Sequence, residues 1–159
     1  MQPINVSVRV DSPREDVYAF LDVLANHEPF TDHMLVDWSY SGPVAGVGAK
    51  ARLRANLPGP QPWADMEVVA AEAPVKIVEQ TVSANGRRRT QGTYTLRECP
   101  DGGTDVCFEM VYLAAPVADR LAMPLLRAWL QRGNAKAMRR LGVTLATSPS
   151  HASGELSPA

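Results

Sequence analysis

Hydrophobic and polar residues alternate with two different periods near the start of the chain. Residues 4–10 alternate between apolar and polar side chains, which predicts a strand with one buried face. Residues 12–24 instead place their apolar side chains on one stripe, with the period of an amphipathic helix. Ser12 as N-cap, Pro13 at the first helical position and Glu15 at the third predict a capping box at the start of this helix.

The next segment predicts a short helix followed by strands. Pro29 interrupts the helical pattern and indicates a second, short helix near 27–33, after which residues 34–40 have the pattern of a strand. Most of the sequence beyond this point predicts a meander of antiparallel strands with one solvated face. The dipeptide Asn85-Gly86 accepts positive φ at both centres of a tight hairpin.

The pattern ends in one long amphipathic helix, predicted from 117 to about 142. Within it, Pro124 either kinks the first turns or marks the true start. A highly curved antiparallel sheet needs a cover for its concave face, and only this helix is long enough, about 36 Å at 1.5 Å per residue. The sequence therefore predicts an α+β fold in which a sheet of seven strands grips a helix.

Composition and charge narrow the class of protein. The 159 residues, 45% of them hydrophobic, fit one domain over 1–145, followed by a tail, 146–159, that we expect to be disordered. A net charge of -1 gives no field that attracts nucleic acid or an anionic membrane. From the sequence pattern we expect neither a signal peptide nor a membrane span. We interpret Cys99 and Cys107 as free thiols in a reducing cytoplasm.

Several phrases resemble the helix-grip superfamily (SRPBCC, START-like), which includes START lipid-transfer domains, the birch-pollen allergen type and bacterial polyketide cyclases or dehydrases. The phrases are "VSVRVDSPREDVYAFLDV", "SGPVAGVGAKARLR", "VVAAEAPVKIVEQT", "GTYTLRECPDGGTDVCFEM" and "LLRAWLQRGNAKAMRRL". The resemblance spans about residues 4–142. It implies a curved seven-stranded antiparallel sheet wrapped around a long C-terminal helix, with two short helices between strands 1 and 2. It also implies a cavity between sheet and helix that holds a hydrophobic, polyketide- or lipid-like small molecule.

The apolar phase of each strand gives the residues expected to line this cavity. A solid core would show the same periodicity, so the cavity itself comes from the resemblance. Gln80 and Thr90 fall on inward phases, whereas Asp65, Glu67 and Glu109 fall outside. The expected ligand-binding residues are Trp38, Leu53, Met66, Tyr94, Phe108, Met110, Leu126 and Leu130, with Val36 and Tyr40 on the same face as Trp38.

Three polar residues are candidates for catalysis. Tyr112 and Tyr40 are hydroxyl donors, although each is also explained as a core tyrosine, and His33 is the candidate proton carrier. In the alternative interpretation His33 ends the short helix and stays solvated. His27 and His33 are six residues apart, which does not place two imidazoles on one side of a helix, so we expect no metal.

These observations leave three hypotheses. The first is an enzyme, a cofactor-independent cyclase, dehydratase or isomerase; the second is a non-catalytic carrier of a lipid or other hydrophobic ligand. The third is a protein-interaction module that uses the convex surface. Arg87, Arg88 and Arg89 are interpreted as solvated residues at a strand end, or as a contact for a phosphate or an acyl carrier protein. We expect no metal or organic cofactor.

Overall fold

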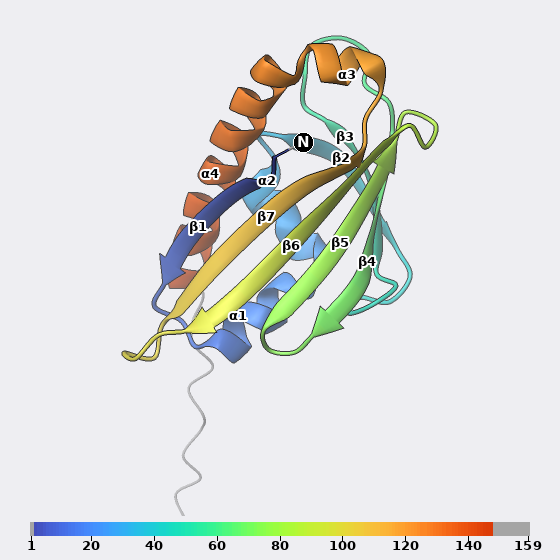
Figure 1. Ribbon diagram of the computed structural model, residues 1–159. Coiled ribbons are helices and arrows are strands. Elements are labelled where there is room, and N and C mark those ends of the chain that lie inside the picture. The colour runs from blue at the N-terminus through green and yellow to red at the C-terminus, as the bar shows by residue number, and fades with distance from the viewer. Residues whose placement is uncertain (1, 148–159) are drawn as a thin grey trace, which may run out of the picture.

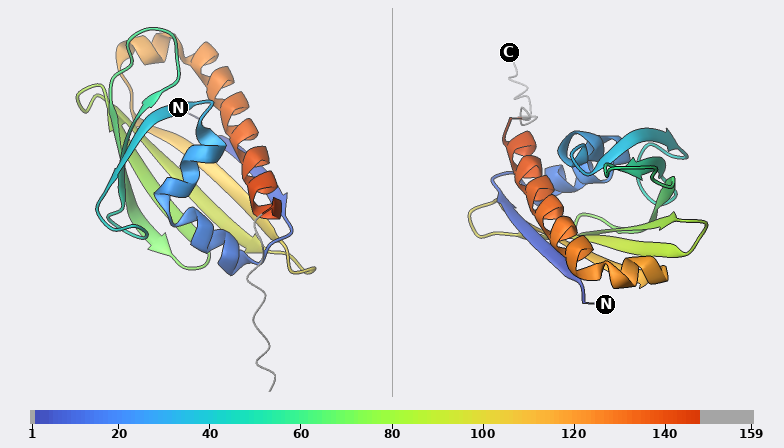
Figure 2. Two further views of the ribbon diagram at one scale, coloured as in Figure 1. Left: turned by 180° about the vertical axis from the view of Figure 1, so that it is seen from behind. Right: turned by 90° about the horizontal axis from the view of Figure 1, so that it is seen from above.

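The structure is a computed structural model that describes residues 2–147. It consists of one antiparallel sheet with helices packed on one of its faces (Figures 1 and 2). The elements are β1 (Ile4–Val10), α1 (Arg14–Leu21), η1 (Leu24–His27), α2 (Glu28–Thr31), β2 (Leu35–Ser41), β3 (Lys50–Ala55), β4 (Ala64–Glu72), β5 (Lys76–Ser83), β6 (Arg88–Glu98), β7 (Thr104–Ala114), α3 (Val117–Leu121) and α4 (Met123–Thr147).

The sheet has seven strands in the order β1-β7-β6-β5-β4-β3-β2. Strands β2 to β7 form a meander. The last strand, β7, also pairs with the first strand, β1, so that Val6 lies opposite Phe108. The predicted fold class, a helix-grip α+β fold, is confirmed. The hairpin at Asn85-Gly86 is also present, but its turn is longer than predicted, because Ala84, Asn85 and Gly86 all adopt positive φ.

Helix α4 crosses the concave face of the sheet, next to β1, while α1, η1 and α2 cover the same face farther along (Figure 2). The C-terminal half of α4 contributes Ala137, Met138, Leu141 and Leu145 to the main hydrophobic core. Its N-terminal half contributes Leu130 to a second, smaller cluster. The interior therefore has a packed half and a less filled half.

The predicted capping box is wrong. Helix α1 begins at Arg14, and the carbonyl of Pro13 accepts hydrogen bonds from the backbone N–H groups of Asp16 and Val17, both at 3.1 Å. No side chain of the described residues caps the helix. The backbone of Ser12 is held elsewhere, since its carbonyl accepts a hydrogen bond of 2.8 Å from the Thr104 hydroxyl.

The predicted long helix is divided at Ala122 into α3 and α4. Pro124 lies in the first turn of α4, where a missing N–H costs nothing, so it marks the start of the helix. Of the predicted tail, 146–159, the first two residues end α4 and the rest lies outside the described residues. None of the helices within 2–147 has the length and apolarity needed to cross a bilayer.

Candidate functional site

A cavity of about 200 Å³ lies between the concave face of the sheet and the N-terminal half of α4. An apolar cavity of about 150 Å³ holds benzene, so this volume suits a small ring compound. Strands β2 to β7, the end of α2, the β3–β4 loop and α4 all contribute to its wall. The apolar part of the wall is made by Met34, Leu35, Leu53, Ala55, Leu57, Pro62, Ala64, Met66, Gly92, Phe108, Met110, Leu126, Trp129 and Leu130.

Most of the predicted ligand-binding residues lie in this wall. They come from three strands, β3, β4 and β7, and from α4, and therefore only the folded protein brings them together. The residues that were expected there and are found there are Leu53, Met66, Phe108, Met110, Tyr112, Leu126 and Leu130. Thr90 also faces the cavity, as predicted, but Gln80 lies on the outer face and is hydrogen bonded to Gln91.

The expectation that Val36, Trp38 and Tyr40 share the cavity wall is wrong. Strand β2 contains a bulge after Val36, where Asp37 has a φ of 59°, and this shifts the alternation of the strand. As a result Leu35 faces the cavity in place of Val36. Trp38 packs against the main core and donates a hydrogen bond of 3.3 Å to the Leu35 carbonyl.

Tyr40 lies away from the cavity, near the sheet edge. It is 44% exposed, stacks on Trp38 and donates a hydrogen bond of 2.7 Å to the Glu28 carboxylate. Tyr94 was also expected in the wall, but it is buried deeper, behind Phe108, with their ring centroids 4.7 Å apart. Neither hydroxyl reaches the cavity wall, so neither is placed to contact a ligand there.

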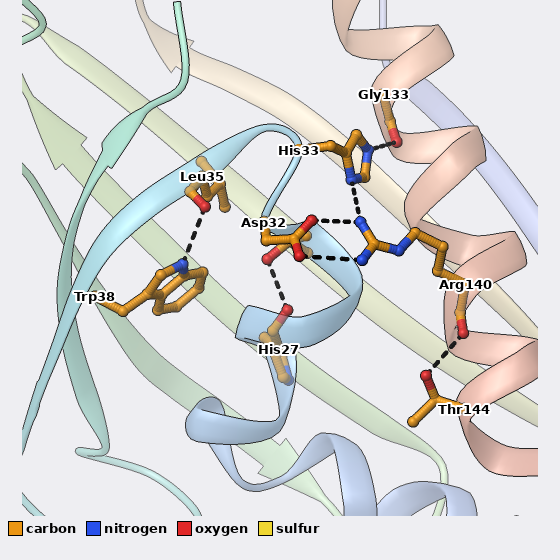
Figure 3. A network of polar contacts seen from close by, with 9 residues as sticks. His27, Asp32, His33, Leu35, Trp38, Gly133, Arg140 and Thr144 are labelled. Carbon is orange, nitrogen blue, oxygen red and sulfur yellow. Dashed lines mark hydrogen bonds and ion pairs between the residues drawn. The ribbon is translucent and has the colours of Figure 1, made fainter. Parts of the chain in front are cut away.

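His33 also lies outside the cavity, in a joint between α2 and α4 (Figure 3). Its Nε2 donates a hydrogen bond of 3.0 Å to the Gly133 carbonyl, so Nδ1 accepts a contact of 3.2 Å from Arg140. Arg140 also makes a bidentate ion pair with Asp32. The pair lowers the pKa of Asp32 and raises that of Arg140. Both nitrogens of His33 are therefore used to fix α2 against the long helix.

Glu79 was not predicted from the sequence, yet among the described residues it is the one carboxyl group in the cavity wall. Glu79 is 6% exposed, on the central strand β5, and faces Gly92 on β6. A Cβ atom at Gly92 would lie 3.0 Å from Oε1 of Glu79, so the missing side chain makes room for the carboxyl group. Oε2 of Glu79 has no hydrogen-bond partner within the described part of the chain.

Behind Glu79 lies His27, the other histidine of the η1–α2 segment. Its Nε2 donates a hydrogen bond of 2.7 Å to the Leu21 carbonyl, so in the neutral ring Nδ1 carries a lone pair. That lone pair faces Oε2 of Glu79 at 3.7 Å. Burial raises the pKa of Glu79 to about 7 and lowers the pKa of His27 to about 4. Near neutral pH the two residues are therefore a neutral imidazole and a carboxyl group for which both the protonated and the ionised form are accessible.

Near the wall formed by β6 and β7, an ion pair attaches α3 to the sheet. Arg88 of β6 donates hydrogen bonds of 2.5 and 2.8 Å to the two carboxylate oxygens of Asp119 on α3. The bonds raise the pKa of Arg88. Arg88 and Tyr112 both line the cavity, whereas Arg87 and Arg89 are exposed. The three arginines therefore have different environments, and only Arg88 is part of the cavity.

Asp119→Asn is expected to loosen α3, because an amide cannot form the bidentate charged pair with Arg88. A loss of about 1 kcal/mol corresponds to roughly fivefold faster amide hydrogen exchange within 117–121. Asp65→Asn is the matched control, since Asp65 pairs with Arg52 at 3.8 Å on the solvated face. Equal exchange in α3 for both variants would show that the Arg88 pair does not hold this helix.

A larger hollow of about 490 Å³ lies on the outer face of β2 to β5. Its charged side chains are arranged as ion pairs across neighbouring strands, Lys50 with Glu67 at 3.6 Å and Arg52 with Asp65. This groove therefore offers a solvated surface with opposite charges already matched. The smaller cavity is the better candidate site, because it combines apolar walls with an unpartnered buried carboxyl group.

The fold and the cavity together define a helix-grip protein with an internal apolar pocket. The chain matches no family model and no curated protein. Solved structures do match over nearly its whole length. The protein TTHA0849 from Thermus thermophilus superposes with a TM-score of 0.68 at 18% identity, covering 92% of this chain and all of that one (100%).

Two other similar structures carry more descriptive names. DynU16, from the dynemicin biosynthetic locus, has a TM-score of 0.62 at 19% identity, and the match covers 92% of this chain and 48% of DynU16. Ara h 8.0201 has a TM-score of 0.62 at 8% identity, covering 92% and 99% of the two chains. At such identities the likeness establishes the fold alone, and it agrees with the resemblance found in the sequence.

Proposed function

We propose that the protein binds a hydrophobic, polyketide- or lipid-like small molecule in the cavity and acts on it as a cofactor-independent cyclase, dehydratase or isomerase. The observation that carries this proposal is the cavity itself, with apolar walls on both sheet and helix. The biosynthetic setting of DynU16 supports it by analogy. Tyr112, which lines the cavity, is the hydroxyl donor that we retain from the sequence analysis.

The proposal extends to how the substrate arrives. A substrate attached to an acyl carrier protein would bring an acidic surface to the protein, and the exposed Arg87 and Arg89 offer it positive charge at the end of the β5–β6 hairpin. Arg88 is already neutralised by Asp119. The free thiols Cys99 and Cys107 fit a reducing cytoplasm as the place of action.

Thr90→Phe is expected to weaken binding of the neutral fluorescent probe N-phenyl-1-naphthylamine at least tenfold, because the added ring fills the cavity. Titration of probe fluorescence measures the effect. Gln91→Phe is the matched control, since Gln91 is the next residue on β6 and belongs to the outer face. Equal affinity of the two variants would place the probe outside the cavity and contradict the proposal.

Native mass spectrometry of the protein from its host is the direct test of ligand class. A co-purifying apolar molecule that is absent from Thr90→Phe supports binding in the cavity. Turnover of that molecule then separates an enzyme from a carrier, the alternative that shares the same walls. A protein that is empty and also fails to bind the probe would overturn the proposal.

A further inference from the structure

The buried carboxyl group of Glu79 is the feature of the cavity for which the fold gives no structural reason. It is nine-tenths buried, it lies in the cavity wall, and its Oε2 lacks a hydrogen-bond partner among the described residues. A buried polar group without a partner costs stability unless a ligand or a reaction uses it. The other charged group in the wall, Arg88, is satisfied by Asp119. Glu79 is thus the cavity group still available to react.

The surroundings of Glu79 favour a base. His27 from η1 faces Oε2 of Glu79. In the neutral ring, however, the single N–H group is on Nε2 and already donates a hydrogen bond to the Leu21 carbonyl. A neutral His27 can therefore accept a hydrogen bond from the protonated carboxylic acid, yet it cannot donate one to the carboxylate. Tyr94 on β6 is the other ionisable group near Glu79, and burial, followed by the charge of Glu79, keeps its pKa well above the ordinary value. A carboxylate without donors in an apolar pocket is more basic than one in water.

We propose, building on the proposed cavity function, that Glu79 is the catalytic acid–base residue and that the substrate is a small enolisable ketone. In the step, the Glu79 carboxylate takes the proton from a carbon next to the carbonyl group. The C–H electron pair becomes the new C=C bond, and the C=O π pair moves to oxygen, giving an enolate. The same proton then returns from the carboxyl group to the oxygen or to a carbon, so no oxidant or reductant is needed.

The remaining wall supplies what this step requires. Thr90, Tyr112 and Asn134 line the same cavity, and their hydroxyl and amide groups are donors of the kind suited to an enolate oxygen. The nitrogen of the Asn134 amide has, among the described residues, only the sulfur of Met110, at 3.9 Å, as a partner. A pKa of about 7 keeps both forms of Glu79 populated near neutral pH, as a group that takes and returns a proton needs.

The test uses 2-tetralone, an enolisable two-ring ketone, in D2O. Proton NMR follows the replacement of hydrogen by deuterium at the carbons next to the carbonyl group. We expect the wild type to exchange them faster than buffer, with a rate that rises as a group of pKa near 7 ionises. Glu79→Gln should lower the protein-dependent rate at least tenfold. Glu67→Gln, on the outer face of β4, should leave it unchanged.

Binding is measured in the same samples, by displacement of N-phenyl-1-naphthylamine. Wild type that binds 2-tetralone but exchanges it no faster than Glu79→Gln overturns this inference and leaves a carrier with an intact cavity. Wild type that binds neither compound overturns the proposed function as well. Exchange that is lost in both Glu79→Gln and Thr90→Phe, while Glu67→Gln remains active, supports a proton transfer inside the cavity.

Discussion

Glu79→Gln should make the folded protein more stable at pH 8, by about 3 kcal/mol, and leave its stability nearly unchanged at pH 4. The value follows from a pKa that rises from 4.5 to about 7 on folding, at about 1.36 kcal/mol for each pH unit. Below pH 4.5 Glu79 is protonated in both the folded and the unfolded wild type, so the charge does not reduce the stability of the folded state. Between pH 4.5 and 7 only the unfolded chain ionises, and the folded state loses stability; above pH 7 the loss is complete.

Urea denaturation at both pH values measures the difference between variant and wild type. His27 is present in both proteins, so the destabilisation that follows its own protonation at low pH cancels in the comparison. Glu67→Gln is the control, because the Glu67 side chain is 46% exposed and pairs with Lys50 on the outer face. A stabilisation of equal size at pH 4 and pH 8 would show that the charge of Glu79 is not its origin.

A stabilising substitution at Glu79 would also bear on function. The carboxyl group lies on a central strand, where an apolar side chain would pack without the cost of desolvating a charge. Functional sites commonly carry such destabilising groups, and their replacement raises stability while activity falls. The stability measurement and the exchange measurement thus examine the same residue independently.

The sequence predicted the fold well because the fold depends on repeated, local patterns. The alternation over 4–10, the long amphipathic helix and the Asn85-Gly86 turn are each visible within a short window. The order of elements then leaves one cover for the concave face. The division of the long helix at Ala122 was also indicated, since Pro124 fits the first turn of a helix better than its interior.

The site was harder to predict because it depends on the phase of single strands. In β5, Ile77 and Val78 are both buried, so the apolar pattern does not show which face comes next. Choosing the wrong phase placed Gln80 inside and left Glu79 unnoticed. In β2, the bulge at Asp37 exchanged Val36 for Leu35. In both strands the pairing with neighbouring strands decides which side chains face the cavity. That pairing joins residues far apart in the sequence, so a local pattern does not show it.

His27 shows a further limit. Both His27 and His33 were considered from the sequence, and His33 was chosen as the candidate proton carrier. Neither histidine lines the cavity, but His27 lies directly behind Glu79, since the η1 turn buries its ring against Phe30 and Tyr94. A single-turn helix has too few residues to show a face by periodicity. The spacing of the two histidines in the sequence therefore could not show that His27, and not His33, lies next to Glu79.

The two halves of α4 should respond differently to the same substitution. Leu141 is fully buried (0% exposed) in the main core, whereas Leu126 lines the cavity and is only partly buried. Leu141→Ala is therefore expected to destabilise the protein by about 3 kcal/mol, through lost burial and a new void, and Leu126→Ala by about 1 kcal/mol or less.

Thermal or urea denaturation of the two variants measures these losses, and probe titration gives the second readout. Leu126→Ala enlarges the cavity and should change the affinity for N-phenyl-1-naphthylamine, while Leu141→Ala should leave it unaltered in the folded fraction. If the long helix instead packed uniformly along its length, both leucines would cost the same stability and neither would alter binding. An equal loss would thus contradict the partition of the interior into a solid half and a half that receives the ligand.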